Sequence, residues 1–166
     1  MATTDTLCVF FPADNEPPSS NYATLDTRNG HPVLDFDAST DESAIFTGIL
    51  PSNYAGGGLD VILIWAASSA TSGSCRWSTA IERLEDEGTD MDADSFATAN
   101  TAGATAPGTS GAVQYTTIAH TSGAQMDSLA ANEAFRLKVM RDADGTSGTD
   151  DMTGDAELVA VHIKET

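Results

Sequence analysis

Basic residues are scarce in this sequence. It contains 7 lysines and arginines against 25 aspartates and glutamates, which gives a formal net charge of −18, and its only lysines are Lys138 and Lys164. A surface this acidic repels phosphate backbones, so the composition argues against a nucleic-acid partner. The acidic segments favour solubility, salt tolerance or a basic partner instead.

Long apolar runs are also lacking. The N-terminal segment MATTDTLCVFF has no basic region and no long apolar core, and nothing later in the chain approaches the length of a membrane span. We therefore expect a soluble protein that is made in a cytoplasm and has no membrane partner. A chain of 166 residues is long enough to bury the core of one domain.

Cysteine is limited to two positions, Cys8 and Cys75, and both lie in strand-like runs. This placement is typical of small buried hydrophobic side chains rather than of a disulfide framework. A bridge between the two residues stays open as the alternative.

The common catalytic motifs are absent. The sequence has no Gly-x-Ser-x-Gly elbow, no phosphate-binding loop and no dinucleotide fingerprint. Its histidines, His31, His120 and His162, fall on separate predicted strands without metal-ligand spacing, so we interpret them as surface or edge residues. The sequence therefore predicts a protein that is not an enzyme and needs no cofactor.

One aspartate cluster has the first spacings of an EF-hand calcium loop. Asp90, Asp92 and Asp94 match that pattern, but Ser95 stands where glycine is needed and Thr101 where a bidentate glutamate belongs. The EF-hand interpretation therefore fails at both diagnostic positions.

A second aspartate cluster lies between residues 142 and 155. Asp142, Asp144 and Asp150 are candidate ligands for a structural Ca²⁺ ion, because carboxylates and loop carbonyls together suit a hard cation. The alternative is a solvated acidic turn without an ion.

The stretch from Gly58 to Leu84 organises the rest of the chain. Two apolar runs flank a loop of serine, threonine and glycine, a pattern that predicts a β-hairpin with Trp65 opposite Trp77 in one core. The other face of the first run carries Ile62 and Ile64. A strand that is apolar on both faces usually needs cover on both, which indicates assembly with another chain.

Short strand-like segments separated by turn signals fill most of the remaining sequence, and Arg28-Asn29-Gly30 predicts a second hairpin. The long connection 85–111 reads as a loop, and 125–132 is the only helix-like piece. About eight or nine strands with almost no helix predict an all-β fold, an antiparallel β-sandwich. Eight strands in two sheets favour the jelly-roll type, and an immunoglobulin-like sandwich stays open as the alternative. We expect an N-terminal arm over residues 1–21 and a single sandwich domain over 22–166.

Several segments resemble small virion structural proteins of tailed bacteriophages. The similarity extends roughly from Leu25 to Glu165, and its marks are scaffold features rather than catalytic residues. They are Phe36, Asp41-Glu42, Pro51 and Tyr54 with the glycines before the Trp65 strand, Trp77, and the strand 135–141 with the Asp/Gly loop that follows it.

The resemblance implies a capsid decoration (cement) protein with a jelly-roll fold. Such a protein is expected to form a homo-oligomer, most simply a trimer, to bind the major capsid protein on the outer capsid surface of the virion, and to assemble in the host cytoplasm. We expect contacts from the N-terminal arm, from the loop 87–111 and from the Ile62/Ile64 face. The candidate contact residues are Leu7, Val9, Phe10, Phe11, Ile62, Ile64, Met91 and Phe96.

Two alternatives belong to other classes. A receptor- or glycan-binding module of a tail fibre or tail tip would show exposed aromatic side chains or an ion site in the 142–155 loop. An unrelated acidic sandwich from a salt-adapted organism would instead lose stability at low salt through self-repulsion.

Overall fold

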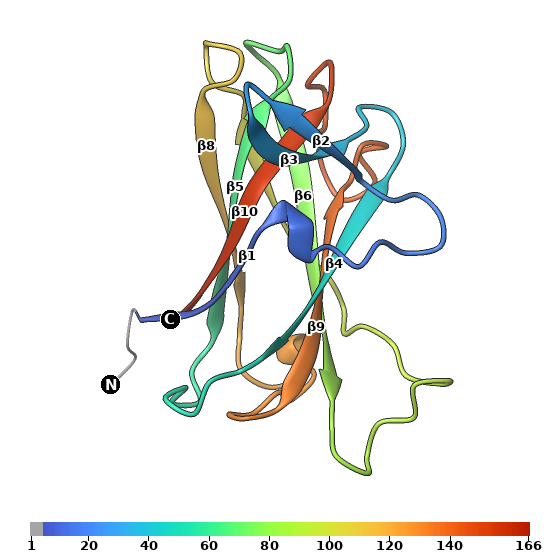
Figure 1. Ribbon diagram of the computed structural model, residues 1–166, viewed down its shortest axis with the longest axis vertical. Helices are drawn as coiled ribbons and strands as arrows, with labels where there is room; N and C mark the ends of the chain where they lie inside the picture. The colour runs from blue at the N-terminus through green and yellow to red at the C-terminus, as the bar shows by residue number, and fades with distance from the viewer. Residues whose placement is uncertain (1–4) are drawn as a thin grey trace.

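The computed structural model describes residues 5–166, which form two antiparallel β-sheets packed face to face (Figure 1). The predicted fold class, an antiparallel β-sandwich of the jelly-roll type, is confirmed. One sheet has the strand order β2-β3-β10-β5-β8 with β1 also on β10, and the other has the order β4-β9-β6-β7. The strands are β1 (Thr6–Phe10), β2 (Thr24–Arg28), β3 (His31–Phe36), β4 (Glu42–Ile49), β5 (Leu59–Ala67), β6 (Ser74–Leu84), β7 (Asn100–Thr105), β8 (Val113–His120), β9 (Ala134–Arg141) and β10 (Ala156–Glu165).

The predicted hairpin between β5 and β6 is wrong. β5 pairs with β10 and β8 in the six-stranded sheet, whereas β6 pairs with β9 and β7 in the other. The connection between them crosses from one sheet to the other, so Trp65 and Trp77 meet across the core, with ring centroids 5.7 Å apart. Alternation places both tryptophans inward in either arrangement, so the sequence pattern predicted the shared core but not the pairing.

The hairpin between β2 and β3 is confirmed. Arg28 pairs with His31, and the turn residues Asn29 and Gly30 have φ angles of 47° and 80°. These positive angles are those of a tight hairpin turn, which Asn-Gly adopts with little strain.

The predicted loop 85–111 contains a strand. β7 (Asn100–Thr105) pairs with β6, from Ser74 opposite Thr105 to Thr79 opposite Asn100. We expected side chains this small to form no regular structure, but an edge strand needs only backbone pairing on one side and small groups against the core. The predicted helix is likewise reduced to one 3₁₀ turn, η2 (Ala124–Met126).

Part of the predicted N-terminal arm is built into the sandwich. β1 pairs with β10, and residues 15–23 cover the outer edge of β4 through the hydrogen bonds Glu16 N to Ile45 O (2.7 Å) and Ala23 N to Ser43 O (3.0 Å). Between them lies the 3₁₀ turn η1 (Pro12–Asp14). Residues 1–4 of the arm lie outside the described residues. No helix among residues 5–166 is long and apolar enough to cross a membrane.

A buried ion pair closes one end of the sandwich. Arg141, at 0% exposure, donates from Nε and Nη2 to the carboxylate of Asp150 (3.0 and 2.8 Å) and also to the carbonyls of Met152 and Gly154. The guanidinium therefore ties the loop between β9 and β10 to the sheet.

Candidate binding site

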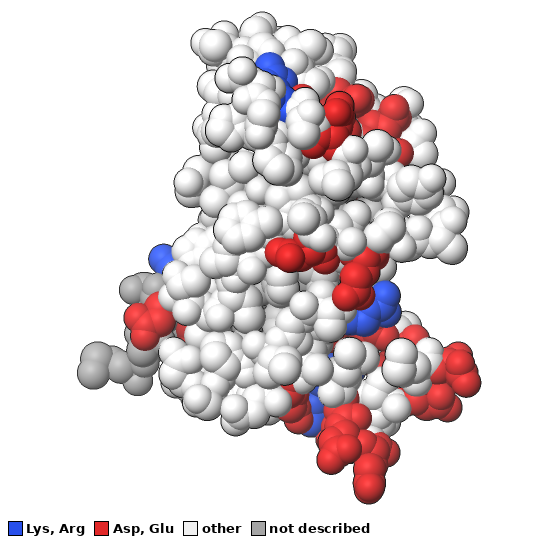
Figure 2. Space-filling view, in the orientation of Figure 1, with Lys and Arg blue, Asp and Glu red and all other residues white. Residues whose placement is uncertain are grey.

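The outer face of the six-stranded sheet is largely uncharged at its centre. Ile62 and Ile64 on β5 are half-buried there, and Tyr115 on β8 is 63% exposed. In Figure 2, acidic side chains gather over the loop that follows β6, near the upper end of the view and in a smaller group between them, and most of the remaining visible surface is uncharged. Although the chain has a net charge of −18, the centre of this face is therefore formed by apolar and uncharged side chains.

A groove crosses this sheet at the end where β2 and β3 turn. It forms where one edge of β10 passes from one partner strand to another. β3 pairs with Ala156–Leu158, and β1 begins its pairing at Val161. Between these two partners, a register shift between Leu158 and Ala160 turns Val159 outward. We call this feature, with a volume of about 450 Å³, the outer groove. Its lining residues are Arg28, Asn29, His31, Val33, Ala66, Gly111, Val113, Glu157 and Val159.

A second hollow of about 250 Å³ continues the outer groove past His31 and Val159. It reaches Phe11, which is 57% exposed. At the opposite end, Val113 is followed on the same face of β8 by Tyr115. An aromatic ring therefore flanks each end of a surface that spans β3, β10, β5 and β8, about 14 Å at the usual strand spacing.

An ion pair forms the polar floor of the outer groove. Arg28 Nη1 donates to Glu157 Oε2 at 2.5 Å and to the carbonyl of Ser68 at 3.0 Å. Gly111, with a φ of 78°, lies against this guanidinium, and a Cβ there would stand 2.8 Å from Arg28 Nη2. The left-handed φ explains why glycine occupies the position, because a side chain there would be strained.

The carboxylates beside this floor are not fully balanced by cations. Asp35 is the register neighbour of Glu157, and burial together with the negative charges of Glu157, Asp26 and Asp155 raises the pKa of Asp35 to about 6. Arg28 is the local counter-charge to these several carboxylates, so negative charge predominates at this end of the outer groove. Anionic ligands are therefore disfavoured there. The arrangement suits an uncharged ligand that has both apolar faces and hydrogen-bonding groups.

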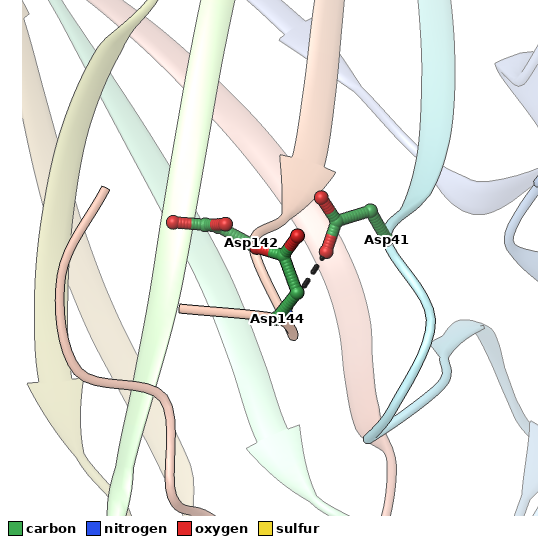
Figure 3. A group of neighbouring side chains, drawn as sticks. All are labelled: Asp41, Asp142 and Asp144. Carbon is green, nitrogen blue, oxygen red and sulfur yellow. Dashed lines mark hydrogen bonds between the residues drawn. The ribbon is translucent and has the colours of Figure 1, made fainter. Parts of the chain in front are cut away.

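The aspartates predicted as cation ligands are only partly brought together. Asp142 and Asp144 meet Asp41 from the turn before β4, and an oxygen of each carboxylate lies within 4.8 Å of the others (Figure 3). Asp150 instead pairs with buried Arg141. Asp41 was not predicted because about 100 residues separate it from its neighbours in the sequence.

This aspartate cluster also organises its own loop. Asp41 accepts a hydrogen bond from Asp144 N (3.1 Å), and Asp142 accepts hydrogen bonds from Thr146 N (3.2 Å) and Ser147 N (2.7 Å). Three converging carboxylates can ligate a hard divalent cation. The same carboxylate oxygens also accept the hydrogen bonds that hold the loop after β9 in place.

The predicted contact residues on the N-terminal strand are divided between core and surface. Phe10 is 7% exposed and stacks on Phe46 with ring centroids 5.4 Å apart, so it is a core residue and not an available contact. The alternation along β1 explains this correction: Val9 is 43% exposed, Leu7 packs partly against the core, and Phe11 follows the end of the strand.

The remaining predicted contact residues lie on two different surfaces. Ile62 and Ile64 belong to the outer face of the six-stranded sheet. Met91 is 85% exposed on the acidic loop, and Phe96 lies under the guanidinium of Arg136, 5.2 Å from its ring centroid. The structure thus does not gather the predicted contacts into one site.

One histidine differs from the prediction. His120 is 1% exposed between the sheets, with Nε2 2.8 Å from Thr79 Oγ1 and Nδ1 3.2 Å from the carbonyl of Gln125. Burial lowers the pKa of His120. His120 is a core residue rather than a surface one, because it is the last residue of β8 whose side chain points inward.

Comparison with known proteins supports the fold. No protein-family model matches the chain, and no match is found among curated proteins. Among solved structures, it is similar to a carbohydrate-binding module (CBM6cm-2) from Cellvibrio mixtus lichenase 5A in complex with cellotriose, with a TM-score of 0.52, 13% identity and coverage of 98% of this chain and 99% of that one. The C-terminal CBM6 of the laminarinase LamC from Zobellia galactanivorans gives a TM-score of 0.48 at 14% identity, covering 96% of this chain and 99% of that one. At 13% identity the likeness to the Cellvibrio mixtus module concerns the sandwich fold alone.

Proposed function

We propose that this protein is a non-catalytic carbohydrate-binding module that holds a glycan in the outer groove. The observation that carries the proposal is the pairing of exposed aromatic rings with a polar floor on a rigid sheet. Tyr115 and Phe11 flank the two ends, and Arg28, Asn29 and Glu157 lie between them.

The chemistry of a sugar explains this choice of ligand. A pyranose ring has apolar C–H faces that pack on aromatic rings, and its hydroxyl groups need both donors and acceptors. Arg28 supplies N–H donors, Glu157 supplies carboxylate oxygens and the Asn29 amide supplies both. The fold shared with a module crystallised with cellotriose is consistent with this use of the sheet.

Two features expected of a glycan-binding module are present in the structure. Aromatic side chains are exposed at Phe11, Tyr22 and Tyr115, and the loop after β9 contributes two carboxylates to a cluster that could hold an ion. The capsid decoration role, the trimer, the major capsid protein as partner and the virion location stay predictions from the sequence. A glycan-binding role is compatible with a place on a tail fibre or tail tip.

The test is a binding screen of the purified chain against neutral and acidic polysaccharides by affinity electrophoresis, followed by calorimetry on each hit. We expect at least one neutral glycan to bind, and Tyr115→Ala to weaken that binding at least tenfold, because it removes one of the two aromatic rings that flank the groove. Tyr22→Ala removes another exposed tyrosine, 50% exposed against 63% for Tyr115, that lies outside the outer groove, and it is the matched control. If no glycan binds, or if both variants bind like the wild type, the proposal is wrong.

A further inference from the structure

Within residues 5–166 the two sheets have five edge strands, and four of them are protected. β1, which pairs only with β10, has five residues and a register shift between Thr6 and Cys8. The edge of β4 is covered by the hydrogen bonds of residues 15–23. β2 is a short strand of five residues that carries Asp26 and Arg28, and β7 is six residues long and contains Gly103. Short length, charge, glycine and cover by another segment are the usual means of preventing an edge from pairing with another chain.

β8 has none of these protections over residues 113–117, and only its far end is covered, where Asn100 of β7 meets the carbonyl of Ala119. Its eight residues, Val113 to His120, include no lysine, arginine, aspartate, glutamate, proline or glycine, and no register shift interrupts its pairing with β5. The outward side chains of Val113, Tyr115 and Thr117 are all exposed. β8 is therefore the edge on which a further strand can be added with least obstruction.

One hydrogen bond identifies the backbone groups that point away from the sheet. Asn100 Nδ2 from the opposite sheet donates to the carbonyl of Ala119 at 2.6 Å, so Ala119 faces the open edge. Alternate residues of an antiparallel strand direct their N–H and C=O groups to the same side. Val113, Tyr115 and Thr117 thus present theirs to the edge, and within residues 5–166 these groups meet no partner there.

We propose that a second copy of this chain pairs with β8 in antiparallel fashion, with the two-fold axis at Tyr115. Val113 of each copy then lies opposite Thr117 of the other, and the two Tyr115 side chains are neighbours. Three outward residues on each strand give about six hydrogen bonds between the copies. The result is an isologous dimer with one continuous sheet.

The chemistry of β8 favours a copy of itself as the partner. Two strands without charged side chains meet without opposing like charges, and tyrosine opposite tyrosine and valine opposite threonine are favourable cross-strand pairs. Each whole chain nevertheless carries a net charge of −18, which opposes association. Salt screens this long-range repulsion and leaves the hydrogen bonds intact, so the dimer strengthens as ionic strength rises.

The dimer goes beyond the proposed glycan binding and does not depend on it. In the dimer, the Val113 ends of the two outer grooves point toward each other across the junction. A long glycan could then contact both copies. This would raise the avidity for polymers relative to short oligosaccharides.

Sedimentation velocity over a concentration series, in about 0.05 M and about 0.5 M NaCl, tests the proposal. We expect the wild type to shift from the 17.2 kDa chain toward twice that mass as concentration rises, and to do so at lower concentration in high salt. Thr117→Lys places a charge opposite Val113 of the other copy, and Thr117→Pro removes an edge N–H that the β5 ladder does not use. Either change should weaken association at least tenfold, and thermal melts establish that both variants are folded.

Leu25→Lys is the matched control, because Leu25 is 58% exposed on β2, the opposite edge of the same sheet. It should dimerise like the wild type. A wild type that stays monomeric in high salt at the highest concentration would overturn the proposal. So would a closed trimer, dimerisation of Thr117→Pro at wild-type strength, or an equal loss in Leu25→Lys, which would point to β2 or to net charge alone.

Discussion

Replacing Asp35 by asparagine should stabilise the protein at neutral pH, although most changes to a partly buried polar residue destabilise. Asp35 lies on the outer face of β3, and its Oδ1 is buried without a hydrogen-bond partner among the described residues. Burial, followed by the negative charges of Glu157, Asp26 and Asp155, raises its pKa from 3.8 to about 6. The folded protein therefore holds this proton more tightly than the unfolded chain does.

The sign of the pH dependence follows from that shift. Asp35 contributes its full stabilisation below about pH 4, where it is protonated in both states, and this contribution is lost as the pH rises through about 6. A shift of this size corresponds to about 3 kcal/mol, at about 1.4 kcal/mol per pKa unit. Because Asp35 is partly exposed, solvent screening reduces the effect to about 1 kcal/mol. The asparagine side chain of the variant is neutral at every pH and escapes this loss.

Urea unfolding of the wild type and of Asp35→Asn at pH 4 and pH 7 measures the difference. We expect near equality at pH 4 and a gain of about 1 kcal/mol in the free energy of unfolding of the variant at pH 7. Asp86→Asn, on the exposed acidic loop, changes the net charge equally and controls for general self-repulsion. A gain in Asp35→Asn no larger than that in Asp86→Asn, or one that is equal at both pH values, would refute the reasoning.

Three further predictions concern stability and thiol chemistry. Arg141→Met leaves the carboxylate of Asp150 buried without its cation and should cost about 3–5 kcal/mol in urea unfolding. Glu85→Gln, which breaks a partly exposed pair with Arg83, should cost about 1 kcal/mol or less, and equal costs would contradict the account. Phe10→Ala should lower the free energy of unfolding by about 3–5 kcal/mol, because it removes a ring that stacks in the core. Phe11→Ala should leave the free energy of unfolding nearly unchanged. A small effect of Phe10→Ala would instead indicate that β1 is only loosely attached to the sandwich. Cys75 is fully buried and its pKa is raised, so it should resist thiol reagents in the folded protein. After unfolding without a reductant, both cysteines should react with the reagent. Fewer than two reactive thiols would indicate a bridge.

The fold was predictable where alternation along one strand decides the outcome. The runs that became β5, β6 and β9 place Trp65, Trp77 and Leu137 inward by their own period of two, and Asn29-Gly30 specifies its turn locally. The partner of each strand was not predictable in this way. A strand presents the same face to the core whether its sequence neighbour pairs with it or crosses to the other sheet.

The candidate site was largely invisible in the sequence. The outer groove depends on β10 changing neighbours at Val159 and on Arg28 reaching Glu157 across 129 positions, and neither leaves a local pattern. Asp41 joins Asp142 and Asp144 through the same kind of long-range contact. The available signal was the alternation of β8, which grouped Val113 and Tyr115 on one face without showing that this face is open to solvent.

The central claim is that the outer face of the six-stranded sheet binds a glycan, and amide chemical-shift mapping tests it most directly. The ¹⁵N-labelled protein is titrated with the glycan that binds best in the screen. The account predicts that the shifts gather on His31, Gly111, Val113, Tyr115 and Val159. Shifts confined to the four-stranded sheet or to the loop between β6 and β7 would contradict it, because they would place the binding site on the opposite side of the sandwich.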